Sequence, residues 1–334
     1  MFHNLNRRHV LAALPGLAAG LKATPALAEP PPETTRVRLP LFRNISDCQS
    51  PEFVATDLLH AEGLTDVQYV ETGSGPDSAD WLGHGEIDFD WNFPPGHVRS
   101  IANGLPIKVL AGMHGGCVEL FANETIHGVK DLKGKRVGVD QMLGVPHLFL
   151  IIMTAHVGLD PYNDIIWTTK PNFDAVEMFA AGEIDAFLGG PPQPQQMRAR
   201  KLGHVILKMA DDRPWSDYFC CMMSATSVFV ERYPVATKRV LRAMLKSVDM
   251  CVNDPERIAR LAVDGGYSAD YGMALQALRE VRYDVWRDFD PEDSMRFYAL
   301  RMLESGIIKG NPNDIIAAGT DWRFIKELKR ELKK

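Results

Sequence analysis

Short apolar runs of strand length alternate with helix-length amphipathic segments, and one such arrangement occurs twice. Residues 67–72 and 165–169 are rich in β-branched or aromatic side chains, as strands prefer. Each run leads into a polar turn and then an aspartate, Asp77 or Asp174, which is placed to cap a short helix. A second apolar run follows and ends at a Pro-Pro pair, which cannot continue a ladder. The pattern predicts a βαβ unit with parallel strands and a right-handed crossover.

The repetition is exact in register. Gly-Glu-Ile-Asp occurs at 85–88 and again at 182–185, and Pro-Pro occurs at 94–95 and at 191–192, so both motifs recur with the same offset of 97 residues. Repeats of this kind indicate duplicated supersecondary units. The sequence therefore predicts an α/β protein with two similar lobes.

Helices are expected before each unit and throughout the last third of the chain. Residues 51–63 and 146–158 each begin with proline and end at glycine, the usual asymmetry of helix ends. After residue 223 the chain is expected to be helical, with an apolar stripe through Leu241, Met244, Leu245, Val248 and Val252.

The composition is that of an ordinary soluble protein preceded by an export signal. The 334 residues are 46% hydrophobic and 24% charged with a net charge of −6, so nucleic acid is not an expected partner. Arg7 and Arg8 precede an apolar run at 10–21 and a small-residue site at 26–28. We expect residues 1–28 to be a twin-arginine signal peptide cleaved after Ala28, with an ordinary secretion signal as the alternative.

The carboxyl ends of the predicted strands hold the candidate site, because ligands of open parallel sheets bind there. The loops combine glycine or proline with small polar residues and open helices, whose N-termini attract anionic or polar groups. Two of the residues have a structural alternative: His114 as a buried structural histidine and Asp47 as a helix cap. The predicted ligand-binding residues are Asn44, Ser46, Asp47, Gly73, Ser74, Asn92, Phe93, His114, Gln141, Leu143, Gly144, Gly190 and Pro191.

Motifs of catalysis or metal binding are not recognisable. The sequence has no Gly-x-Ser-x-Gly elbow, no His-Glu-x-x-His and no histidine pair at ligand spacing, so we expect no catalytic residue, metal site or cofactor. Adjacent thiols could bind a soft metal, but neighbouring cysteines in a strand are poor joint ligands. An odd number of cysteines leaves at least one unpaired, and most are expected to be buried thiols. The five cysteines are Cys48, Cys117, Cys220, Cys221 and Cys251.

Taken together, these motifs carry a family resemblance. The paired arginines, the two Gly-Glu-Ile-Asp units, the segment Asp-Leu-Lys-Gly-Lys-Arg-Val-Gly-Val at 131–139 and the helical tail after 228–234 resemble the extracytoplasmic solute-binding proteins of ABC importers. Within these, the chain is similar to the nitrate/sulfonate/taurine group, which also holds thiamine-pyrimidine-precursor binders. The resemblance covers everything after the leader.

The resemblance implies a two-lobed type II periplasmic binding fold with the ligand cleft between the lobes. Lobe 1 would comprise 34–121 plus 222–334, and lobe 2 would comprise 122–221. It implies a periplasmic monomer that captures a small organic solute, anionic or heterocyclic, and delivers it to an ABC permease in the inner membrane.

An enzyme is the alternative that the same resemblance raises. The superfamily contains a thiamine-pyrimidine synthase with a Cys-Cys-Cys-Phe-Cys iron motif and a lysine that holds pyridoxal phosphate. Cys220-Cys221-Met222-Met223 falls at that motif without two of its cysteines, and Asn92 stands where the lysine would be. Both departures favour binding without turnover over an exported or relict enzyme of thiamine-precursor or related heterocycle metabolism.

Overall fold

The computed structural model describes residues 29–42, 47–72 and 76–333. Residues 31–334 form one unit, which holds every described strand and helix. The predicted signal peptide and the candidate residues Asn44, Ser46, Gly73 and Ser74 lie outside the described residues.

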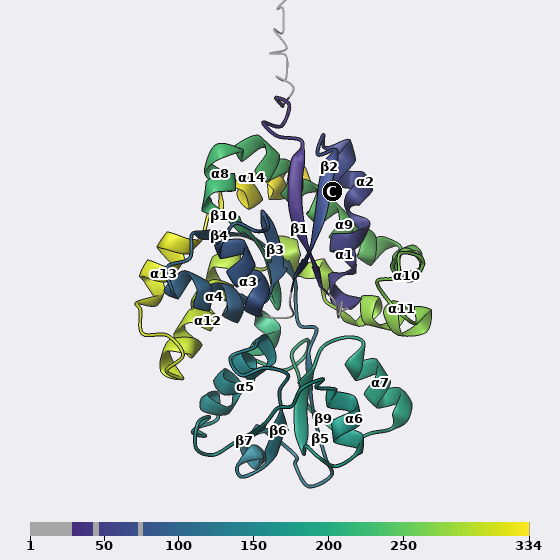
Figure 1. Cartoon of the computed structure of the whole chain (residues 1–334), viewed down its shortest axis with the longest axis vertical. Helices are drawn as coiled ribbons and strands as arrows, with labels where there is room; N and C mark the ends of the chain where they lie inside the picture. Colours follow the sequence, from purple (N-terminus) through teal and green to yellow (C-terminus); the bar gives the residue numbers. More distant parts are fainter. Residues whose placement is uncertain (1–28, 43–46, 73–75, 334) are drawn as a thin grey trace, which may run out of the picture. The chain divides into compact units, whose positions relative to one another are not determined.

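The first group of strands is a two-stranded sheet, β1-β2, beside a three-stranded sheet, β3-β10-β4, which gives the spatial order β2-β1-β3-β10-β4; the two together are called the first sheet. β1 and β2 are parallel, and β10 is antiparallel to both β3 and β4. β1 lies beside β3, where the backbone N–H of Asp88 donates to the carbonyl of Arg38 at 2.9 Å. The strands are β1 (Arg36–Phe42), β2 (Asp66–Thr72), β3 (Phe89–Asn92), β4 (Ile107–His114) and β10 (Cys221–Thr226) (Figure 1).

The second sheet repeats this order as β7-β6-β8-β5-β9. β6 is parallel to β7 and β8, whereas β5 is antiparallel to β8 and β9. Each sheet therefore contains one reversed strand in the same place, β10 in the first and β5 in the second. The strands are β5 (Glu119–Ala122), β6 (Arg136–Gly138), β7 (Ile166–Thr168), β8 (Ala186–Gly189) and β9 (His204–Lys208) (Figure 1).

The two strands of each predicted βαβ unit are parallel but not adjacent. β1 lies between β2 and β3, and β6 lies between β7 and β8. The inserted strand thus lies between a fully buried partner, β3 or β8, and a partly exposed outer partner, β2 or β7.

An arginine–aspartate clamp marks the duplication at atomic level. Arg38 donates from Nη2 and Nε to the Asp88 carboxylate at 2.6 and 3.2 Å, and its backbone N–H donates to the same carboxylate at 2.8 Å. Arg136 makes the same three bonds to Asp185 at 2.7, 3.1 and 2.9 Å. Both aspartates are the last residue of a Gly-Glu-Ile-Asp motif, so the repeated tetrapeptide delivers the acid of the clamp.

Most helix ends lie at the capping residues and glycines that the sequence predicts. Asp174 caps α6 and accepts from the backbone N–H of Glu177, as predicted. Gly63 and Gly158 follow α2 and α5 with φ of +93° and +86°, a conformation that favours glycine. The predicted helix at 51–63 is two helices, α1 and α2, that meet at Ala55. The helices around the sheets are α1 (Ser50–Val54), α2 (Thr56–Ala61), α3 (Pro76–Gly83), α4 (Pro94–Ala102), α5 (Val145–His156), α6 (Ala175–Ala180) and α7 (Gln193–Arg200).

The chain is helical after β10, which ends at Thr226, three residues beyond the predicted start of the helical tail. Four of the five residues in the predicted stripe of α9 are fully buried, but Val252 is 47% exposed, and its neighbour Cys251, 1% exposed, continues the buried face in the last turn. None of the described helices combines the length and apolar character needed to cross a bilayer. The tail comprises α8 (Ser227–Arg232), α9 (Pro234–Asn253), α10 (Pro255–Asp264), α11 (Tyr271–Glu280), α12 (Pro291–Glu304), α13 (Pro312–Gly319) and α14 (Arg323–Glu331).

The chain passes from one sheet to the other in two segments that touch. Residues 115–118 join β4 to β5, and residues 209–220 join β9 to β10. The backbone N–H of Met209 donates to the carbonyl of Val118 at 3.1 Å. A Cβ on Gly116 would lie 2.3 Å from the backbone nitrogen of Ala210, so only glycine permits this approach. Four short 3₁₀ helices complete the described part of the fold: η1 (Asp47–Gln49), η2 (Val129–Leu132), η3 (Trp215–Asp217) and η4 (Tyr283–Arg287).

Candidate functional site

The strand-end loops of the two sheets meet in the structure. The backbone N–H of Asp47, which follows β1, donates to the carbonyl of Pro191, which follows β8, at 3.3 Å. The ring of Phe93, at the start of α4, makes an edge contact with Phe149 of α5, with centroids 5.5 Å apart. Predicted site residues from both halves of the chain are therefore neighbours.

Asp47 is a buried acid at this meeting point. Its side chain is 2% exposed and one carboxylate oxygen, Oδ2, has no hydrogen-bond partner among the described residues. Burial raises the pKa of Asp47 to about 6, against the opposing effect of the Ser268 hydroxyl. The N-cap of α1 is Gln49, without a side-chain bond, so the alternative role of Asp47 as a helix cap is not observed.

Asn92 is buried and bonded within its own half. Its amide Nδ2 donates to the hydroxyl of Ser78, and its Oδ1 accepts from the backbone N–H of Phe93 at 2.7 Å. Only 4% of the residue is exposed. In this conformation Asn92 orients the loop that carries Phe93.

The loop before α5 is held in a defined shape. Leu143 has a φ of +63°, which is uncommon for a side chain with a Cβ. Its backbone N–H donates to Nδ1 of His147 at 2.7 Å. Burial lowers the pKa of His147 to about 4, so the imidazole is neutral and can accept this bond. Gln141 and Leu143 are exposed, whereas Gly144 is the N-cap of α5.

Arg99 is a residue that sequence reasoning missed. From α4, its guanidinium donates to the carbonyl of Leu143 at 3.0 Å and to the carboxylate of Asp80 at 3.3 Å. It thus connects the first sheet's helices to the loop after β6. One signal was present in the sequence, because Asp80 aligns with the acidic residue Glu177 in the repeat. In the structure each acid pairs with an arginine of the helix that follows it, Asp80 with Arg99 and Glu177 with Arg200.

His114 does not line an open surface, and faces a cluster of cysteines instead. It is fully buried, between Trp91 and Tyr283. Its ring nitrogen Nδ1 lies 2.7 Å from the carbonyl oxygen of Gly115. The ligand atoms of four buried residues all lie within 4.8 Å of one another: Cys48, His114, Cys117 and Cys221.

A fifth sulfur adjoins this cluster. Sγ of Cys220 lies 3.3 Å from Sγ of Cys117. Hydrogen bonds from the Cys117 and Cys221 thiols hold the pKa of Cys48 well below its ordinary value, which favours a thiolate at that position. Burial raises the pKa of Cys251, which lies apart on α9. The sequence did not reveal the cluster because its members are distant along the chain.

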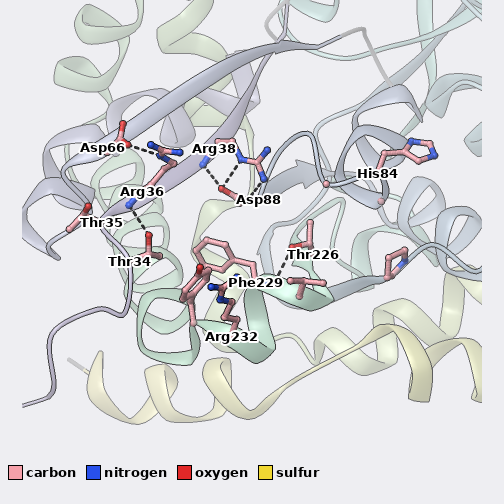
Figure 2. Close-up of a pocket in the computed structure, with 15 residues that line it drawn as sticks. Thr34, Thr35, Arg36, Arg38, Asp66, His84, Asp88, Thr226, Phe229 and Arg232 are labelled. Carbon is pink, nitrogen blue, oxygen red and sulfur yellow. Dashed lines mark hydrogen bonds and ion pairs between the residues drawn. The ribbon is translucent and has the colours of Figure 1, made fainter.

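A separate cavity of about 750 Å³ lies at the opposite, amino-terminal edge of the first sheet. Figure 2 shows that its walls carry Arg36 and Arg38, each bonded to an aspartate, Asp66 or Asp88. These charges are neutralised within the protein, and ligands of parallel sheets bind at the other edge. The strand-end loops, not this cavity, are therefore the candidate solute site.

Comparison with known proteins agrees with this architecture. A model of the NMT1-like family matches residues 30–264. The chain belongs to the NMT1-like family. This member is 23% identical over 264 residues to the nitrate/nitrite binding protein NrtA of Nostoc sp., an alignment that covers 71% of this chain and 59% of the relative. The chain thus spans about three fifths of that curated relative.

Solved structures share the fold of this NMT1-like protein. The periplasmic nitrate-binding protein NrtA of Synechocystis PCC 6803 matches with a TM-score of 0.75 at 16% identity, covering 91% of this chain and 90% of that one. The alkanesulfonate-binding protein SsuA of Xanthomonas axonopodis pv. citri, bound to MOPS, matches with a TM-score of 0.70 at 16% identity, covering 87% and 99%. The predicted α/β periplasmic-binding fold and the predicted group of relatives are confirmed.

Proposed function

We propose that this chain is the substrate-binding component of an ABC importer. It captures a small organic solute between two lobes, one built on each group of strands with the crossings at 115–118 and 209–220, and presents it to an inner-membrane permease as a periplasmic monomer. One observation carries the proposal: the carboxyl-end loops of two duplicated sheets meet, through Asp47 and Pro191. The named relatives are binding proteins for nitrate and alkanesulfonate, which supports capture without turnover.

The solute is proposed to be a planar heterocycle that carries N–H donors, rather than a simple inorganic anion. Of the predicted site residues that the structure describes, none is lysine or arginine, and the guanidinium of Arg99 beside them is already paired with the Asp80 carboxylate. Asp47 is a buried acid with one oxygen that has no partner among the residues that the structure describes, which disfavours an anion and suits a donor. Phe93 supplies an aromatic face or edge for a flat ligand.

The first helix after β3 also disfavours an anion. α4 begins with Pro94 and Pro95, which have no backbone N–H to offer at the helix N-terminus. Anion binding at helix N-termini depends on those groups. The α4 end is therefore a weaker anion seat than an ordinary helix start, although it still leaves Phe93 placed to stack.

The proposal is tested with the full chain and three solute classes: nitrate, a short alkanesulfonate and an aminopyrimidine. We expect the aminopyrimidine alone to raise the melting temperature strongly, since a ligand at ~100 times its dissociation constant adds ~2.7 kcal/mol. Calorimetry of Asp47→Asn should show at least ~10-fold weaker binding, because a hydrogen bond to a charged group contributes ~1.5–3 kcal/mol. Asp66→Asn, at an exposed ion pair on the other edge of the sheet, is the matched control.

Each outcome has a distinct meaning. Stabilisation by nitrate or the sulfonate alone would contradict the heterocycle class and leave the importer role standing. The absence of binding in all three classes, with no co-purified molecule in native mass spectrometry, would contradict the importer role. Recovery of the solute in altered form would favour the enzyme alternative.

A further inference from the structure

The cluster beneath the strand ends has the composition of a structural metal site. Three sulfurs and one imidazole converge in a region where the four residues are between 0% and 8% exposed. Cys₃His is one of the donor sets that hold structural zinc in proteins. We propose that this cluster binds one Zn²⁺ ion through Cys48, His114, Cys117 and Cys221.

The separations fit a tetrahedral ion after a small adjustment. Zinc–sulfur bonds of ~2.3 Å and zinc–nitrogen bonds of ~2.0–2.1 Å place the donor atoms roughly 3.4–3.8 Å apart in a tetrahedron. Here all four donor atoms lie within 4.8 Å of one another. The donor atoms therefore need to approach one another by no more than about 1 Å to complete the geometry.

The imidazole of His114 is already in the required tautomer. The carbonyl oxygen of Gly115 can only accept, so Nδ1 carries the hydrogen and donates to it at 2.7 Å. Nε2 is then the nitrogen with the lone pair. It is buried with no nitrogen or oxygen partner among the described residues, and the side chain that the ring can bond is Cys48, itself a member of the cluster. Metal-bound histidines show this arrangement, one nitrogen on the metal and the other donating to a carbonyl.

The donors are mounted on regular structure. His114 ends β4 and Cys221 opens β10, and the two are direct partners across the antiparallel pair. The backbone N–H of Cys220 donates to the carbonyl of His114 at 2.9 Å, which locks this pairing. The hydroxyl of Tyr283 donates to the carbonyl of Cys48 at 2.8 Å. Such supports position metal ligands before the ion binds.

The site joins the two segments that connect the sheets. Cys117 lies in the segment 115–118, and Cys221 directly follows the segment 209–220. A bound ion would tie both crossings to Cys48 of η1, at the place where motion between the halves must be accommodated. This inference does not depend on the proposed importer role.

A disulfide is the competing chemistry. The sulfurs of Cys117 and Cys220 are 3.3 Å apart, and a disulfide would bring them to ~2.05 Å. Because Cys117 is also a proposed zinc ligand, a Cys117–Cys220 disulfide and the zinc site exclude each other. The state of the thiols therefore decides between them.

The experiment uses the full chain, purified with reductant in metal-free buffer. After addition of Zn²⁺ and gel filtration, elemental analysis should find one zinc per chain. Co²⁺ in place of Zn²⁺ should give the intense visible bands of a tetrahedral site and a thiolate-to-cobalt charge-transfer band in the near ultraviolet. The wild-type measurements stand alone, so they remain decisive even if a variant fails to fold.

Variants then assign the ligands. Cys221→Ser should weaken zinc binding by more than ~100-fold, since changes one layer further from the metal already cost ~10–100-fold. Cys251→Ser is the matched control, because Cys251 is equally buried but lies outside the cluster. It should retain full zinc content and the cobalt spectrum.

Three results would overturn the proposal. The first is zinc well below one per chain after reconstitution. The second is a cobalt spectrum typical of octahedral, oxygen-ligated metal, which would indicate surface binding. The third is thiol counting in denaturant that finds two thiols missing in protein purified without reductant, with no metal taken up after the disulfide is reduced.

Discussion

The buried carboxyl of Asp90 makes stability fall as the pH rises. Asp90 is fully buried on β3, where Oδ2 accepts from the Ser78 hydroxyl and Oδ1 has no partner among the described residues. Burial raises its pKa to about 7, although the amide of Asn92 and the hydroxyl of Ser78 act in the opposite direction. The carboxyl is thus neutral in the folded protein at mildly acidic pH.

The magnitude follows from the two states of this group. In the unfolded chain the pKa is ~3.9, so the folded protein holds a proton that the unfolded chain releases between about pH 4 and 7. The resulting stabilisation is fully present below about pH 4 and is lost as the pH rises through about 7. Between about pH 5.5 and 8 the free energy of unfolding should fall by about 2 kcal/mol from Asp90 alone.

Asp90→Asn removes this titration while keeping the size of the side chain. Urea unfolding, followed by tryptophan fluorescence at several pH values, should show a stability difference between wild type and variant that changes by about 2 kcal/mol over this range. Asp66→Asn is the control: its carboxyl is exposed and a hydrogen bond from Arg36 lowers its pKa, so it should produce no such fall. A flat difference curve for Asp90→Asn would refute a neutral buried acid.

Two further predictions concern the stability of the fold. Arg38→Met should lower the free energy of unfolding by about 2–3 kcal/mol, because Asp88 is left as a nearly buried, uncompensated charge. Arg36→Met, at an exposed ion pair, is the control and should cost under ~1 kcal/mol. Equal effects of the two substitutions in urea unfolding would contradict the stabilising role of the clamp. Gly116→Ala should destabilise by roughly 2–4 kcal/mol, since its Cβ would meet backbone at 2.3 Å, and Gly128→Ala, with open space around it, should be near neutral in the same assay.

The local elements of the fold were predictable because their signals are local. Repeated motifs and end-of-helix glycines placed β2, β7 and the helices before and after them within a few residues. The insertion of β1 and β6 between the paired strands was not predictable, because strand order depends on contacts between distant segments. Val252 was misjudged because Cys251 and Val252, three and four residues after Val248, both fit a helical stripe, and only Cys251 is buried.

The candidate site was only partly visible in the sequence. Parallel-sheet topology predicts which loops share an edge, and Asp47 and Pro191 do meet. Side-chain direction is not fixed by topology: the sequence left His114 open as either a ligand donor or a buried structural histidine, and the folded chain buries it. Cys48 and Cys117 lie 69 residues apart, and only the folded chain shows that they share a site with His114.

The arginine–aspartate clamp of each sheet also fixes the register in which its strands pair. A strand displaced by one residue would turn every side chain to the wrong face, and apolar strands resist such slippage only through shape. At Arg38 and Arg136 the main-chain N–H and the side chain of one residue grip a single acid. Only one strand register satisfies all those bonds. Each half can therefore select its correct register independently of the other half.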